Sequence, residues 1–99
     1  MTYERLGSLR THPGKREEVV AILLSGLEGL AAVGCIVYDV SLDLGNEDLI
    51  WVREVWVDLA NHRASLQLPE TRAAIGAAMP LLTGEFTGAE IRTVGGVPS

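Results

Sequence analysis

Apolar and polar residues recur in two different periods along the first third of this chain. Residues 2–10 alternate weakly between the two kinds and predict a strand that ends in a turn at 11–15, where a proline and a glycine stand. Over residues 15–31 the apolar positions return at i, i+3, i+4 and i+7, which is the period of an amphipathic helix. The apolar stripe of this predicted helix contains Val20, Leu23, Leu24, Leu27 and Ala31.

The middle of the chain predicts a hairpin. Residues 35–44 and 49–58 are rich in β-branched and aromatic side chains, as strands are. The four residues between them, GNED, are typical of a turn. Two strands joined by so short a connection are expected to pair antiparallel.

A helix pair follows the hairpin. Residues 59–68 predict a short helix with Asp58 as its N-cap, and Pro69 suits the first turn of the next helix. Pro80 is expected to kink or shorten this second helix. Its apolar side is formed by Thr71, Ala74, Ile75, Ala78, Met79 and Leu82.

The last element is a strand, and the whole order predicts the fold class. Gly84 is expected to break the chain before a strand at 85–94, and residues 95–99 form a tail without a packing signal. The order β-α-β-β-α-α-β over one domain, residues 1–99, favours an α+β ferredoxin-like sandwich with an antiparallel sheet.

The strand at 49–58 has two apolar faces. Strand parity puts Ile50, Val52, Glu54 and Trp56 on one face and Trp51, Arg53, Val55 and Val57 on the other. Helices cover one face of a ferredoxin-like sheet, so the second face would expose a sizeable apolar patch. We therefore expect a homodimer in which two sheets pack face to face.

Composition narrows the class of protein. With 47% hydrophobic residues the chain can bury a core, and a net charge of −5 argues against nucleic acid or an anionic membrane as the main partner. Residues 1–10 lack the apolar segment of a signal peptide, and the single cysteine, Cys35, cannot form an internal disulfide. A cytoplasmic protein that binds small molecules or a second copy of itself is expected.

Several short stretches carry a family resemblance. They are HPGK at 12–15, GCIVYDV at 34–40, EVW at 54–56, ASLQLPETRAAI at 64–75, MPLL at 79–82 and VGGVP at 94–98, together with Ala60 and His62. Through these stretches nearly the whole chain resembles the antibiotic biosynthesis monooxygenase superfamily. The resemblance implies a dimeric α/β barrel whose subunits each have a pocket between sheet and helices. It also implies oxidation of quinols, polycyclic phenols or haem, often with no metal or flavin.

The family pattern transfers to this chain only in part. In the anthrone oxygenases of the family a strand tryptophan and an aromatic hydroxyl residue six positions later line the pocket; Trp56 and His62 hold these positions here. Val52 stands where those enzymes have an asparagine, and Arg72 is the nearest match to their helix arginine. Haem degraders have an asparagine on the first strand, and residues 2–10 contain none.

Chemistry without a cofactor needs an electron-rich substrate whose conjugate base reduces oxygen directly. His62 is a candidate base near neutral pH. Trp56 could supply a flat wall, Ser65 could orient a substrate oxygen and Arg72 could stabilise an oxyanion. Glu54 shares the face of Trp56, so it could be the base instead, or could pair with an arginine of a neighbouring copy.

Three functions fit these residues. The first is a cofactor-independent monooxygenase that uses O2 on a quinol, polycyclic phenol or anthrone. The second is a non-catalytic dimeric module that binds a small molecule or has a stress-related role, and the third is an isomerase or cyclase. Tyr38 is either a core residue or a phenol that points into the pocket. No cluster of residues in the sequence predicts a metal site.

Overall fold

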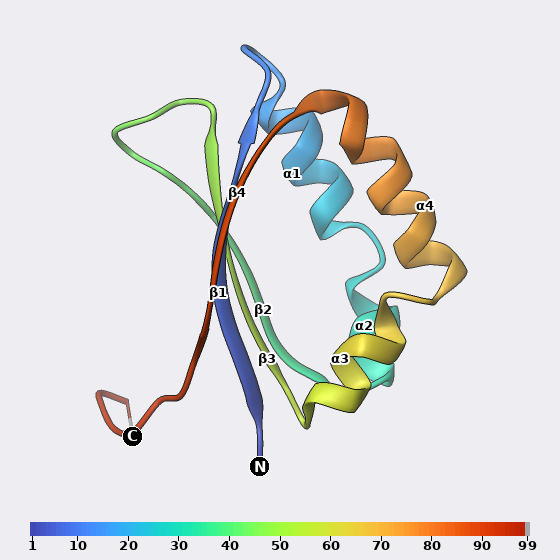
Figure 1. Cartoon of the computed structure of the whole chain (residues 1–99), viewed down its shortest axis with the longest axis vertical. Coiled ribbons are helices and arrows are strands. Elements are labelled where there is room, and N and C mark those ends of the chain that lie inside the picture. The colour runs from blue at the N-terminus through green and yellow to red at the C-terminus, as the bar shows by residue number, and fades with distance from the viewer. Residues whose placement is uncertain (99) are drawn as a thin grey trace.

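The computed structural model of the protein describes residues 1–98 and contains a four-stranded antiparallel sheet with every helix on one face (Figure 1). The last residue of the predicted tail, Ser99, lies outside the described part. The strands follow the spatial order β2-β3-β1-β4. Their bounds are β1 Tyr3–Thr11, β2 Cys35–Leu42, β3 Leu49–Trp56 and β4 Leu82–Ile91. The predicted β2–β3 hairpin and the ferredoxin-like α+β fold are confirmed.

The helices are short. They are α1 Arg16–Leu24, α2 Leu27–Ala32, α3 Leu59–Ser65 and α4 Pro69–Ala78, followed by a 3-10 turn, η1, at Met79–Leu81. Among residues 1–98 no helix has the length and apolar character needed to cross a membrane.

The single helix predicted for residues 15–31 is wrong. The chain leaves the helical conformation at Ser25, and Gly26 has a φ of 72°, in the left-handed region that a side chain disfavours. The chain therefore turns between α1 and α2 (Figure 1). The predicted stripe changes as well, because Val19 is the fully buried residue of α1 whereas Leu24 is 46% exposed.

The start of α3 and both ends of α4 agree with the sequence signals, although α3 ends at Ser65, before the predicted residue 68. Asp58 caps α3, since its carboxylate accepts a hydrogen bond of 2.7 Å from the backbone N–H of Asn61. Pro69 opens α4, and Pro80 lies in the 3-10 turn that ends it.

The last strand begins earlier than predicted. Gly84 was expected to precede the strand but lies inside β4, with a φ of 93°. Between the pairs Leu9↔Phe86 and Thr11↔Leu82, β4 advances four residues while β1 advances two. The left-handed glycine lets the extra residues bulge out, so the strand continues through the position at which a break was expected.

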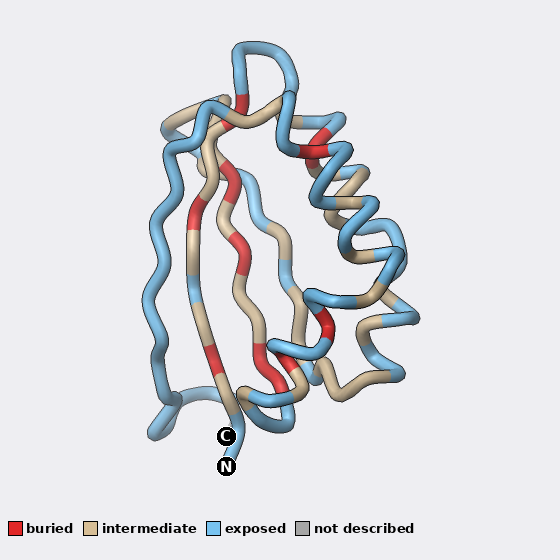
Figure 2. The backbone as a smooth tube through the Cα atoms, turned by 45° about the vertical axis from the view of Figure 1, so that its right-hand side comes forward, coloured by how far each residue is buried: buried red, intermediate tan, exposed pale blue. Residues whose placement is uncertain are grey.

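The core lies between the sheet and α1. Val19, Ile50 and Val52 are its buried members, and Figure 2 shows the buried positions gathered on the central strands and on the sides of the helices that face them. Leu9, Val20, Leu23, Tyr38, Val40, Leu81 and Leu82 pack around this centre.

The two central glycines of the sheet face each other across β1 and β4. Gly7 pairs with Gly88, and a Cβ atom built on Gly7 would lie 2.7 Å from the backbone oxygen of Thr87. Because a backbone atom cannot swing away as a side chain can, any side chain at position 7 forces the two strands apart.

We expect Gly7→Ala to lower the free energy of unfolding by about 1–3 kcal/mol, the usual cost of overpacking. The matched control is Gly76→Ala in α4, where a new Cβ meets nothing within 4 Å. The control is expected to stabilise the protein by up to about 1 kcal/mol through helix propensity. Urea unfolding of both variants measures the difference, and a Gly7→Ala protein as stable as the parent would contradict this account of the sheet.

Candidate functional site

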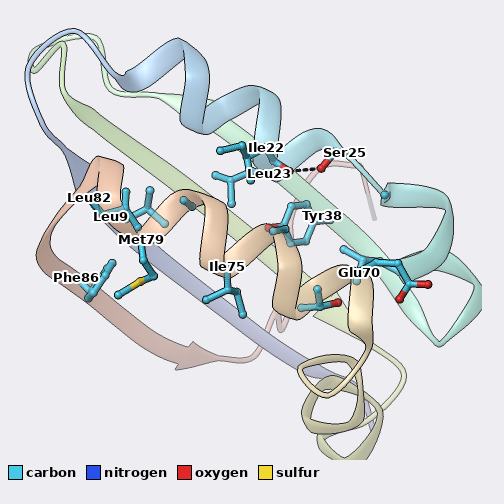
Figure 3. Close-up of a pocket in the computed structure, with 15 residues that line it drawn as sticks. Leu9, Ile22, Leu23, Ser25, Tyr38, Glu70, Ile75, Met79, Leu82 and Phe86 are labelled. Atoms are coloured by element: carbon cyan, nitrogen blue, oxygen red, sulfur yellow. Dashed lines mark hydrogen bonds between the residues drawn. The ribbon is translucent and has the colours of Figure 1, made fainter.

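A cavity of about 410 Å³ opens between α1, α4 and the sheet (Figure 3). Ile22 and Leu23 line it from α1, and Leu9 and Phe86 line it from the sheet. The opposite wall is the stripe predicted for the second helix of the helix pair, because all six of its members line the cavity: Thr71, Ala74, Ile75, Ala78, Met79 and Leu82. The volume falls within the range of about 300–1,000 Å³ typical of small-molecule sites.

The apolar cavity continues into a smaller one with polar walls. This second cavity, of about 250 Å³, shares Leu9, Leu23, Tyr38 and Phe86 with the first. It adds two charged side chains, Arg5 and Glu54. A planar apolar ligand in the larger cavity would therefore have one end next to charged groups.

Strand register explains why these polar groups lie together. Tyr38 pairs with Glu54, Glu54 with Arg5, and Arg5 with Glu90, so the four residues form one row across the sheet. They share the side of the sheet that holds Val52 and Ile50, because side chains two apart on a strand point the same way. The row thus faces the helices and the cavity.

Glu54 is held by two aromatic neighbours. The indole Nε1 of Trp56 donates a hydrogen bond of 3.1 Å to Glu54 Oε1. The imidazole Nε2 of His62 lies 3.8 Å from the same oxygen. The side chain of Glu54 is 17% exposed. Its carboxylate is therefore held by the Trp56 hydrogen bond, lies beside His62 and lines the smaller cavity.

His62 is buried, and its surroundings favour the neutral imidazole. Its ring centroid lies 5.0 Å from that of Tyr3 and 5.5 Å from that of Trp56, in an edge-to-face arrangement with the latter. Its Nδ1 has no hydrogen-bond partner among the described residues. Burial lowers the pKa of His62 below its ordinary value, and the positive charge of Arg5 adds to this, while the carboxylate of Glu54 acts in the opposite direction.

The six-residue spacing between Trp56 and His62 thus brings two rings into contact around one carboxylate. Trp56 ends β3, Asp58 starts α3, and one turn of helix returns His62 to the sheet. Trp56 is 1% exposed. Of these three groups, Glu54 lines the smaller cavity, whereas Trp56 and His62 line neither cavity and lie behind Glu54.

Tyr38 lines both cavities, and Figure 3 shows it in the wall of the larger one. Burial raises the pKa of its phenol to about 12, and the nearby carboxylate of Glu54 contributes to the rise. The hydroxyl therefore stays protonated and can donate a hydrogen bond to a ligand. Both alternatives for Tyr38 hold, because it packs against the core and also lines the cavity.

The remaining predicted site residues lie in different places. Val52 lines the smaller cavity. Ser65 is buried, but its hydroxyl donates a 2.6 Å hydrogen bond to the backbone oxygen of His62 and thus supports the histidine instead of facing a ligand. Arg72 is exposed on α4 and lines neither cavity.

Arg5 is a lining residue that sequence analysis missed, as are Leu9 and Phe86. Its signal was present in the strand at 2–10, where parity places it on the same side as Leu9. The signal could not be used without the register, because only the pairing of Arg5 with Glu54 brings it to the cavity.

Potential metal ligands do not cluster in the described part of the chain. No group of three or more histidine, cysteine, aspartate or glutamate side chains within residues 1–98 could hold a metal ion.

The lowered pKa of His62 predicts a dependence of stability on pH. Below about pH 6.5 the unfolded chain gains a proton at this residue that the folded protein does not, so stability falls as the pH falls, by up to about 1.4 kcal/mol per pH unit. The fall ends once the pH passes the lowered folded pKa. We expect His62→Gln to remove this part of the slope in urea unfolding between pH 7.5 and 5.

The control is His12→Gln at an exposed position. It should leave the slope between pH 7.5 and 5 as in the parent. Equal slopes in the parent and in His62→Gln would show that His62 takes up its proton as easily in the folded state as in the unfolded one.

Comparison with known proteins assigns the chain to a family. The model of the antibiotic biosynthesis monooxygenase family matches residues 2–77. A solved structure named after the same family, from Chloroflexus aurantiacus J-10-fl, is 33% identical and has a TM-score of 0.82. The alignment with it covers 98% of this chain and 99% of that one. No curated protein sequence is significantly similar to the chain.

More distant structures share the fold. A protein from Nitrosomonas europaea is 10% identical with a TM-score of 0.85, over 94% of this chain and 90% of that one. One from Caulobacter crescentus CB15 is 20% identical with a TM-score of 0.77, over 95% and 91% of the two chains. The family match extends over most of the chain and includes β3, α3 and most of α4. The chain belongs to the antibiotic biosynthesis monooxygenase family.

Proposed function

We propose that this protein is a monooxygenase that oxidises an electron-rich aromatic compound, a quinol, polycyclic phenol or anthrone, with O2 and without a cofactor. The observation that carries the proposal is the placement of one carboxylate, Glu54, in the smaller cavity next to an apolar cavity of about 410 Å³. An aromatic substrate needs apolar walls to exclude water, and its ionisation needs a base within reach of its hydroxyl group.

In this mechanism Glu54 accepts the acidic proton of the substrate. The protonated hydroxyl of Tyr38 donates a hydrogen bond to the oxygen that becomes negative. The resulting anion gives electrons to O2, a carbon–oxygen bond forms, and the hydroperoxide loses water. For an anthrone carbon the balance is a ring CH2 and O2 converted to a ring C=O and H2O, so that O2 is the only oxidant.

His62 has a supporting role in this proposal. It lies behind Glu54, 3.8 Å from its carboxylate, and its lowered pKa keeps the imidazole neutral at neutral pH. The choice of base left open by the sequence therefore falls on Glu54, with His62 as the residue that positions the carboxylate.

Glu54→Gln is expected to lower kcat for oxygen uptake by about 10²- to 10⁴-fold, the usual contribution of a positioned base. The amide oxygen can still accept the Trp56 hydrogen bond, so the melting temperature should change little. His62→Gln should lower kcat by less. An oxygen electrode with a panel of hydroquinones and anthrones measures both variants.

The control variant is Glu17→Gln at an exposed position of α1, which should keep the parent rate. A Glu54→Gln enzyme with the parent rate would remove the base assignment. Ligand binding without oxygen uptake would favour the binding module, which the apolar cavity could serve equally well, and product formation without oxygen uptake would favour an isomerase or cyclase.

We also propose that the protein is a homodimer formed through the helix-free face of the sheet. Leu6 lies at the centre of this face, on β1, and is 38% exposed; Ile91 is 41% exposed on β4. Trp51 shares the face from β3 and is half-buried, whereas Val55 on the same face is already buried within the subunit. A second copy of the same sheet is the surface that fits such an apolar patch without exposing another one.

Sedimentation at micromolar concentration is expected to give a dimer for the parent protein and a shift to monomer for Leu6→Lys, which buries a charge in the interface. Leu24→Lys, on the exposed side of α1, is the control and should remain dimeric. A monomeric parent protein would end the dimer proposal.

A further inference from the structure

The polar end of the cavity contains a positive charge that the mechanism above does not use. Arg5 is half-buried in the central part of the sheet and faces the helices. Its strand neighbours in the polar row, Glu54 and Glu90, are both carboxylates. A guanidinium group in such a row would ordinarily form an ion pair with one of them.

Arg5 has no partner of this kind within residues 1–98. No carboxylate oxygen lies within 4.0 Å of its nitrogens, and it donates no hydrogen bond to a described residue. Arg10, by contrast, pairs with Glu85, and Arg53 pairs with Glu4 and Asp39. Arg16 donates to three backbone oxygens.

Glycine makes room for the Arg5 side chain. A Cβ atom built on Gly88 would lie 2.5 Å from Arg5 Nη2, so the guanidinium rests over the bare backbone of β4. Gly88 pairs with Gly7. Gly7 lies two residues before Leu9, and Gly88 lies two residues after Phe86; Leu9 and Phe86 are themselves a pair that lines the cavity. The guanidinium therefore lies in the space between the polar row and the apolar cavity, where it lines the smaller cavity.

We propose that Arg5 binds an anionic oxygen, phenolate or carboxylate, on the aromatic ligand of the cavity. The proposal rests on the proposed function for the identity of the ligand as an aromatic compound. The donors of a guanidinium form a planar fork that matches an anionic oxygen group, and such hydrogen bonds are stronger than neutral ones. Glu54 lies beside Arg5. After the Glu54 carboxylate has taken a proton from the ligand, Arg5 would hold the ligand oxygen that lost it.

A purely structural role for Arg5 makes a different prediction. If Arg5 only balances the charges of Glu54 and Glu90, its removal lowers stability but does not change the preference of the cavity for one ligand charge over another. The test must therefore compare ligands that differ in charge and not in shape.

The matched probes are 2-naphthoate and its neutral isostere 2-naphthamide, with affinities measured by isothermal titration calorimetry on the intact protein. The parent protein is expected to bind the carboxylate more tightly than the amide. Arg5→Gln should weaken naphthoate binding by about 10- to 100-fold and leave naphthamide binding within about twofold. Arg10→Gln, on the opposite face of the same strand, is the matched control and should change neither affinity.

A second variant leaves the arginine in place. Gly88→Ala puts a methyl group where Arg5 Nη2 now lies and, because the end of a long side chain can swing aside, moves the guanidinium without forcing the backbone apart. This variant should also weaken the carboxylate probe selectively. It keeps the proposal testable if Arg5→Gln does not fold.

Turnover separates the two sources of the anion. If Arg5→Gln lowers kcat for a phenolic substrate, the phenolate is bound; if it lowers only naphthoate affinity, the cavity takes a ligand with a permanent carboxylate. Charge-selective binding without any oxygen uptake would support the Arg5 site and end the monooxygenase proposal. Unchanged affinity for both probes with unchanged kcat in both variants, or no binding of either probe to the parent, would overturn the Arg5 proposal.

Discussion

The register between β1 and β3 is the constraint on which the site depends. It places Arg5 opposite Glu54 and Gly7 opposite Val52, so a polar row lies next to an apolar one on the covered face of the sheet. A slip of one residue would turn each strand over, because side chains alternate between faces. Leu6 would then point at the helices and Arg5 at the helix-free face, and the charged end of the cavity would not exist.

The cavity itself results from the way in which the helices end. The chain leaves α1 at Ser25 and turns at Gly26, and both residues line the cavity. A continuous helix over this segment would have carried large apolar side chains across the space. On the other side α4 presents alanines at 74 and 78, whose small side chains leave room above Leu9 and Phe86. The turn at Gly26 and the small side chains of α4 thus leave the volume that a ligand would fill.

The polar row is expensive to bury, and the structure offsets this cost unevenly. Glu54 is satisfied by the Trp56 indole, whereas His62 keeps a buried nitrogen without a partner among the described residues, and Arg5 has no ion pair there. The unpartnered nitrogen of His62 is the buried one of the two, and such an atom usually costs about 1–3 kcal/mol, whereas Arg5 is half-buried. Such costs gather at functional sites, and of these three groups Arg5 and Glu54 line the smaller cavity, where a ligand could supply a partner.

The sequence by itself determined the order of the strands and the helical segments between them, the Asp58 cap, the two prolines at the ends of α4 and the apolar stripe of that helix. These features are local, since caps, proline geometry and side-chain period act within a few residues. It also singled out Glu54, Trp56 and His62 as candidate site residues, but it expected Trp56 and His62 to line the pocket, and in the structure they lie behind Glu54 and line neither cavity. Tertiary structure decided the rest. The break at Gly26 competes with a helical period that continues through it, and the bulge at Gly84 depends on pairing with β1. The roles of Arg5 and Arg72 depended on long-range register and packing, which brought Arg5 to the cavity and left Arg72 exposed on α4.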